Sequence, residues 1–95
     1  MSDAFTLATF SGRVGETFTV QVDDNTSFDI ELAEVSALGA ARPGAREPFS
    51  LVFLGPVHAP QATYRMTNND LGRFDIFIVP LGPEAGRMRY EAVFT

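Results

Sequence analysis

The chain has 95 residues, 45% of them hydrophobic, which is enough for one small domain over residues 1–95 with a core of its own. It contains no cysteine, which excludes a disulfide framework, a cysteine-ligated zinc site and a thiol nucleophile. The net charge is −5, and every basic residue is an arginine. Because a phosphate backbone is bound by basic surfaces, this balance predicts no nucleic-acid partner.

No segment of the sequence is suited to a membrane or to export. The longest apolar runs are far shorter than the ~20 residues needed to cross a bilayer. The first residues have no basic region followed by an apolar one, as a secretory signal would. We therefore expect no membrane partner and a cytoplasmic location.

The first segment, residues 2–12, is compatible with two structures. Ser2 or Asp3 can cap a short helix that carries Leu7 and Phe10 on one face and ends at a glycine. The threonines of the same segment also tolerate an edge strand. We favour a single short helix or turn packed over one end of a sheet.

An antiparallel hairpin is predicted next. Apolar and polar residues alternate over residues 16–22 and again over 28–32, which is typical of half-buried strands. The polar cluster Asp23–Thr26 between them favours a tight turn. Residues 36–46 carry glycine and proline without apolar periodicity, so we expect a mobile surface loop, or one helical turn over Val35–Leu38.

Two later segments, residues 49–54 and 74–79, are apolar on both faces of a strand, and we expect both to be central in the sheet. A proline follows each of them. Their second faces need cover from the N-terminal segment, from another sheet or from another subunit. Weaker strands are predicted around 64–67 and over 88–95, with a loop at 81–86. The pattern predicts an all-β fold, a small antiparallel β-sandwich or barrel of about six strands with at most one short N-terminal helix.

No catalytic constellation stands out in this pattern. His58 is the only histidine, and it lacks the nucleophile and orienting partner that a catalytic base needs, so we interpret it as a loop residue. An enzyme would have to use carboxylates such as Asp70 or Asp75. Acidic residues from Asp23 onward fall at the ligand spacings of a calcium loop, but Phe28 occupies the position that requires glycine. We predict no enzyme activity, no cofactor and no metal.

The candidate interaction surface combines the second faces of the two apolar strands with basic groups of the adjoining loops: Val52, Leu54, Phe77, Val79, Arg42, Arg46 and His58. A protein partner or a second copy of the chain would bind there. The alternative is a sugar or metabolite site at a barrel mouth, built from the loops around residues 36–46, 56–62 and 81–87.

Several segments together resemble a family of small bacterial proteins classed as a domain of unknown function: Phe10, Gly15–Phe18, Leu32–Val35, Pro48–Pro56, Tyr64, Leu71–Gly72, Phe77–Pro80 and Tyr90–Phe94. Proteins of that kind resemble neighbours of phage-tail-collar proteins, also called microcystin-dependent proteins. The resemblance implies no catalytic or binding residues. It implies a structural or protein-interaction module, accessory to a tail-fibre-like assembly into which the chain would be incorporated.

Overall fold

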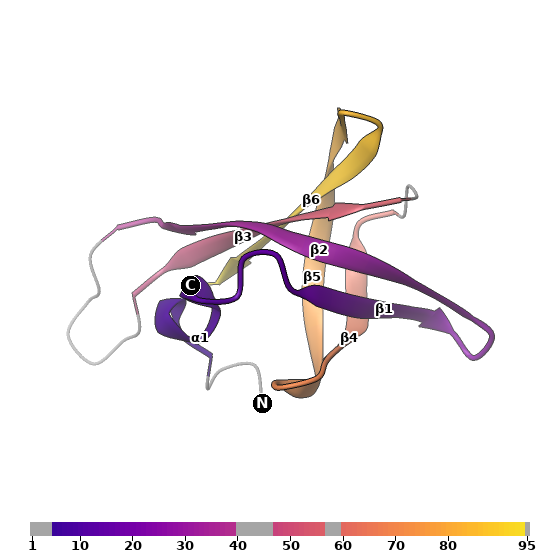
Figure 1. Cartoon of the computed structure of the whole chain (residues 1–95), viewed down its shortest axis with the longest axis horizontal. Coiled ribbons are helices and arrows are strands. Elements are labelled where there is room, and N and C mark those ends of the chain that lie inside the picture. The colour runs from indigo at the N-terminus through magenta and orange to yellow at the C-terminus, as the bar shows by residue number, and fades with distance from the viewer. Residues whose placement is uncertain (1–4, 40–46, 57–59, 95) are drawn as a thin grey trace.

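The computed structural model describes residues 5–39, 47–56 and 60–94. This part of the chain forms one short helix and six strands: α1 (Leu7–Ser11), β1 (Thr17–Asp23), β2 (Thr26–Ala37), β3 (Phe49–Gly55), β4 (Ala62–Asn68), β5 (Gly72–Glu84) and β6 (Arg87–Phe94). The strands pair antiparallel and close into a barrel in the order β1-β2-β3-β6-β5-β4 (Figure 1). The all-β prediction is confirmed, and the barrel is the form adopted.

The predicted hairpin is confirmed as β1 and β2. Phe18 pairs with Ile30 and Val20 with Phe28, so the apolar residues of both strands share the inner face. Its turn is held by a local hydrogen bond, because the Asn25 N–H donates to Asp23 Oδ1 at 2.9 Å. The acidic side chains Asp29 and Glu31 therefore belong to the outer face of β2.

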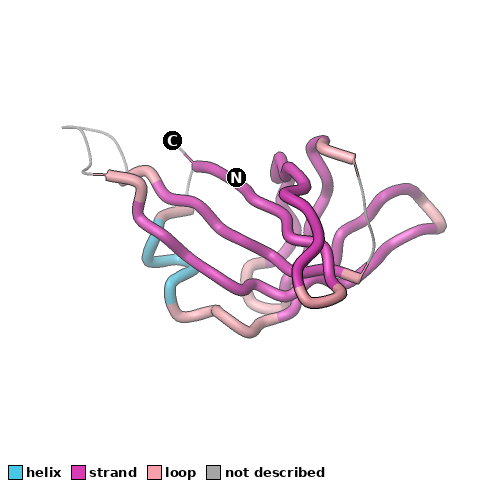
Figure 2. Tube along the Cα trace, turned by 90° about the horizontal axis from the view of Figure 1, so that it is seen from above, coloured by secondary structure: helices cyan, strands magenta, loops and turns pink. Residues whose placement is uncertain are grey.

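The helix α1 covers one end of the barrel, as the N-terminal segment was expected to do (Figure 2). Its N-cap is Thr6, whose backbone N–H donates to Thr9 Oγ1 at 3.0 Å. The predicted caps, Ser2 and Asp3, lie outside the described residues. Phe10, on the inner face of α1, is fully buried, and its ring lies 5.9 Å from that of Phe49 and 5.8 Å from that of Phe94.

Large side chains from all six strands and α1 fill the interior of the described barrel. The fully buried ones are Phe10, Phe18, Val20, Leu32, Phe49, Leu51, Phe53, Met66, Ile78 and Tyr90. The two strands predicted to be central each have a partner on both sides, β3 between β2 and β6, and β5 between β4 and β6. A barrel of this size is a packed core and not a channel.

Two predictions about strand ends are wrong. Residues 81–84 belong to β5, because the strand passes through a bulge between Pro80 and Gly82 and continues to pair with β6. Pro80 lies beyond the last pair of β5 with β4, and at a bulge the missing N–H of proline is tolerated. Residues 35–37 form no helical turn, because Val35 pairs with Leu51 in the β2–β3 ladder. Of the predicted middle loop, residues 36 and 37 thus belong to β2, residues 38 and 39 follow it, and residues 40–46 lie outside the described residues.

Truncation of Phe10 tests the role of α1. We expect Phe10→Ala to lower the free energy of unfolding by about 3–5 kcal/mol, since the ring is fully buried among other aromatic rings. Urea unfolding of Phe77→Ala is the matched control, because Phe77 is 51% exposed and should lose less than about 1 kcal/mol. Equal losses in the two variants would contradict this role of α1.

The β5–β6 turn offers a stabilising substitution. Ala85 and Gly86 both have positive φ, 52° and 81°, as a two-residue type I′ turn requires. Because an L-residue pays a steric cost there, Ala85→Gly should raise the free energy of unfolding by about 0.5–1 kcal/mol. Ala8→Gly, in the exposed face of α1, should lower it by about the same amount. Thermal or urea melts would measure both, and a destabilised Ala85→Gly protein would refute the turn assignment.

Candidate functional site

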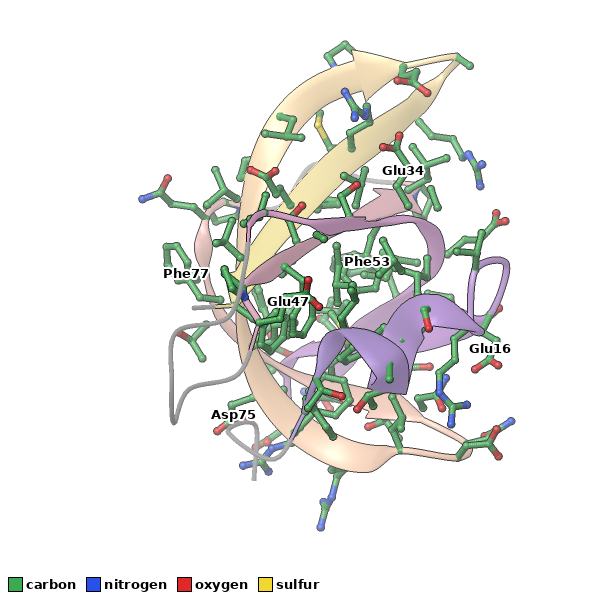
Figure 3. All side chains as sticks on the ribbon, turned by 90° about the vertical axis from the view of Figure 1, so that its left-hand side faces the viewer. Glu16, Glu34, Glu47, Phe53, Asp75 and Phe77 are labelled. Atoms are coloured by element: carbon green, nitrogen blue, oxygen red, sulfur yellow. The ribbon has the colours of Figure 1, made fainter. Side chains whose placement is uncertain are left out.

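The outer face of β5 and β6 carries exposed apolar side chains. Phe77 on β5 is 51% exposed and Val93 on β6 is 54% exposed. The β5–β6 ladder ends at the pair Val79–Glu91, and Phe77 and Val93 each lie two residues beyond this pair on their own strand, while Val79 is half-buried. Figure 3 shows Phe77 pointing away from the barrel while Phe53 points into it. We refer to Phe77, Val79 and Val93 as the outer patch.

The outer face of β3 is covered by neighbouring strands of the same chain. Val52 is only 7% exposed and lies between Glu34 and Glu91 in the ladder. Leu54 lies between Glu31 and Arg89 in the same way. These charged side chains can lay their aliphatic stems over the apolar residues while their heads reach water.

Ion pairs tie these covering side chains together across the strands. Arg89 lies 3.7 Å from Glu34 and 3.2 Å from Glu84. Arg87 donates to Glu31 at 3.0 Å. Of the four predicted interaction residues that the structure describes, Phe77 therefore offers the largest surface, Val79 and Leu54 offer less, and Val52 offers little.

The predicted interaction surface also included three loop residues. Arg42, Arg46 and His58 lie outside the described residues. Of the three loops that we predicted around a barrel mouth, the third is altered, because residues 81–84 and 87 belong to β5 and β6.

An open hollow of about 310 Å³ lies where β3 ends beside β2. Apolar groups of Ile30, Leu54, Gly55 and Pro56 line it together with the polar side chains of Thr17, Asp29, Glu31 and Arg87. Glu31 is engaged by Arg87, and Asp29 accepts a hydrogen bond from Thr19 Oγ1 at 2.8 Å. Sequence reasoning missed this hollow, because it depends on where β3 stops relative to β2.

The two carboxylates considered for catalysis are both in ion pairs. Asp75 lies 3.6 Å from Arg65 on the neighbouring strand. Asp70 accepts a hydrogen bond from Arg13 at 2.9 Å, and this bond is the main reason why the pKa of Arg13 is raised. The raised pKa favours the charged guanidinium, which joins the β4–β5 turn to the segment before β1.

Asn68 closes the seam between β1 and β4, and sequence reasoning missed it. The side chain is buried, and its Nδ2 donates to the Thr17 carbonyl at 3.2 Å and to Glu16 Oε1 at 3.3 Å. Its Oδ1 accepts from the N–H groups of Asp70 at 2.9 Å and Leu71 at 3.1 Å. All four hydrogen-bonding positions of the amide are thus used.

The acidic residues of the calcium pattern are spread along the hairpin. Asp23 lies at the end of β1, while Asp29 and Glu31 lie on β2. Over residues 5–39, 47–56 and 60–94, no three histidine or acidic side chains gather closely enough to hold a metal ion. In the same ranges no helix is long and apolar enough to span a bilayer.

Comparison with known families gives one match. The model of a family described as a domain of unknown function (DUF6916) matches residues 5–94. The chain belongs to the DUF6916 family. Neither the curated proteins nor the solved structures contain a match to it. Membership of an uncharacterised domain family is thus confirmed for this DUF6916 domain, while the link to tail-collar proteins stays a prediction.

Substitution of Asn68 tests how much the seam between β1 and β4 contributes to the stability of the DUF6916 domain. Asn68→Ala would leave buried backbone groups without partners, so the free energy of unfolding should fall by about 1–3 kcal/mol in urea titration. Its neighbour Asn69 is exposed, and Asn69→Ala should change stability by less than about 0.5 kcal/mol. A loss of the same size in both variants would rule out the seam function of Asn68.

Proposed function

We propose that this DUF6916 domain is a non-enzymatic structural or protein-interaction module that binds its partner through the outer patch. The observation that carries the proposal is that Phe77 on β5 and Val93 on β6 are each more than half exposed. The same two strands also carry an ion pair on their outer side, between Arg89 and Glu84, and Arg89 contacts Glu34 as well. Aromatic side chains that are partly exposed and rimmed by polar groups are typical anchors of protein contacts.

Two features of the barrel support a surface function. The buried apolar side chains form one core cluster, whereas Phe77 and Val93 lie outside this cluster and are exposed. Asp70 and Asp75, the carboxylates weighed as catalysts, each contact an arginine and are exposed. Exposed ion pairs of this kind are ordinary features of a protein surface in water, so these carboxylates favour the binding module over an enzyme.

The partner that we propose is a tail-collar-type protein of a phage-tail-fibre-like assembly. Its support is the resemblance of the core segments, above all Pro48–Pro56 and Tyr90–Phe94, to proteins found beside tail-collar proteins. A second copy of the chain is the other partner that an outer patch of this kind suits. Either partner would bury Phe77, the largest exposed side chain of the patch.

A small-ligand module is the second candidate. The hollow beside β2 has a volume of about 310 Å³, near the lower end of the ~300–1,000 Å³ found for ligand pockets. Its carboxylates and its arginine can bind the hydroxyl groups of a sugar or metabolite. A thermal-shift screen that finds stabilisation by one ligand class, lost in Asp29→Ala, would favour this function over the first.

The molar mass in solution tests the outer patch. We would compare the wild type with Phe77→Ser/Val93→Thr at two concentrations by light scattering, alone and with the tail-collar-type protein encoded nearest to it. We expect the wild type to form a complex, with a copy of itself or with that protein, and the double variant to bind at least about tenfold more weakly.

The control is Val14→Thr, because Val14 is equally exposed, at 55%, but lies in the loop before β1. This variant should bind like the wild type. A wild type that stays monomeric in both mixtures, or a complex that the double variant leaves unchanged, would contradict the proposal.

A further inference from the structure

Among residues 5–39, 47–56 and 60–94, the first part of β2 has a strand partner on one side only. β3 pairs with Glu31–Ala37, whereas Thr26–Ile30 pairs with β1 alone. The β1–β2 hairpin accordingly extends past the end of β3 in Figure 1. Within the part of the chain that the structure describes, residues 26–30 of β2 therefore form an open edge, which we call the β2 edge.

The hydrogen bonds of Leu32 show which backbone groups face this edge. The Leu32 N–H donates to the Glu16 carbonyl at 3.0 Å, and its carbonyl accepts from the Gly15 N–H at 2.8 Å, so both groups face the β1 side. Alternate residues along a strand face the same side, which places the backbone groups of Ile30 and Phe28 toward β1. Those of Ser27 and Asp29 face the opposite side, where the described residues include no strand to pair with them.

Pro56 explains why β3 leaves this edge open. Extending the register of the pair Glu31–Leu54 by two residues would place Pro56 opposite Asp29. Proline has no N–H, so it cannot donate to the Asp29 carbonyl, and the ladder ends. Gly55, just before it, has no side chain. A Cβ there would lie 2.6 Å from Ile30 Cγ2, so only glycine fits where β3 turns away from β2. The hollow lies at this junction.

We propose that the β2 edge is a second binding site, which takes an extended basic segment of a partner protein as an added strand. The backbone groups of Ser27 and Asp29 would pair with the segment. Its inward side chain would rest on the apolar groups of the hollow, provided by Ile30 and Leu54 among others. The site is separate from the outer patch, because Phe77, Val79 and Val93 neither lie on β2 nor line the hollow.

Charge decides between a basic partner and a second copy. Asp29 is exposed on the β2 edge, and Asp23 and Asp24 lie at the turn of the same hairpin. Arg87, the basic group of the hollow, is engaged by Glu31 at 3.0 Å. Pairing of two copies edge to edge would bring these carboxylates together, whereas lysine or arginine at alternate positions of an added strand would neutralise them.

Amide hydrogen exchange tests the open edge in the free protein. We expect the N–H groups of Ser27 and Asp29 to exchange at least about tenfold faster than those of Phe28 and Ile30, which face β1. Since all four residues lie in the same strand, local unfolding of β2 affects them alike. Equal protection at the four positions would mean that the edge is covered, and it would overturn the proposal.

Binding is tested with two synthetic probes, an eight-residue peptide of alternating lysine and valine and the same peptide with glutamate in place of lysine. In a titration followed by NMR, the lysine peptide should slow the exchange of Ser27 and Asp29 at least about tenfold and bind at least about tenfold more tightly than the glutamate peptide. No effect on these amides, or equal binding of the two peptides, would refute the site.

Variants separate the edge from the outer patch. Asp29→Lys should reverse the preference between the two peptides. Ser27→Pro should abolish binding while the barrel stays folded, because the N–H that is lost has no strand partner among the described residues. Asp75→Lys, at an exposed acid within the β4–β5 ladder, and Phe77→Ser/Val93→Thr should bind like the wild type. If light scattering shows a dimer that Ser27→Pro dissociates, a second copy occupies the edge and the basic partner is wrong.

Discussion

The contact on which the barrel depends is the packing of Phe10 between strands that are distant in sequence. Its ring lies within 6.4 Å of the rings of Phe18 on β1, Phe49 on β3 and Phe94 on β6. The short helix α1 would be marginal in isolation, because five residues form too few hydrogen bonds to offset the unfavourable free energy of helix nucleation. Burial of this one ring stabilises the helix and covers the end of the barrel at the same time.

The barrel also needs a polar closure, since β1 and β4 share only the pairs Thr19–Thr67, Val20–Met66 and Gln21–Arg65. Beyond them the Asn68 side chain takes the place of a backbone partner for the Thr17 carbonyl. Next to Asn68, Arg13 forms ion pairs with Asp70 and Glu16. Solvent weakens each of these pairs, but together they join the β4–β5 turn to the segment before β1. This end of the seam between β1 and β4 is thus held by side chains and not by the ladder.

Both surfaces that we propose lie outside the core cluster of the described barrel. The buried aromatic and aliphatic side chains form that one cluster, and neither proposed surface depends on it. The two surfaces that we propose differ in chemistry. The outer patch offers apolar area around Phe77, and the β2 edge offers backbone groups in an acidic setting. A module with two such surfaces can bind two partners at once, as a connector within an assembly would.

The local pattern of the sequence already determined much of the fold. Alternation predicted the β1–β2 hairpin and the inner faces of β3, β5 and β6, because side chains alternate between the faces of a strand. The same rule predicted that Phe77 and Val79 would share the second face of β5. The length of β5 was underestimated, because a proline ends a strand only where its N–H would be needed, and Pro80 lies at a bulge past the end of β4.

The binding surfaces depended on which residue of the neighbouring strand pairs with each outward side chain. The local sequence pattern does not show these pairs. Val52 and Phe77 have the same character in the sequence, yet Val52 lies between two glutamates and is buried, while Phe77 lies beside Thr63 and is exposed. The function of Asn68 likewise arises only because closure brings β1 beside β4. The sequence by itself determined which residues face the core. Register and closure, which are set by contacts between distant segments, decided which of the remaining residues a partner can reach.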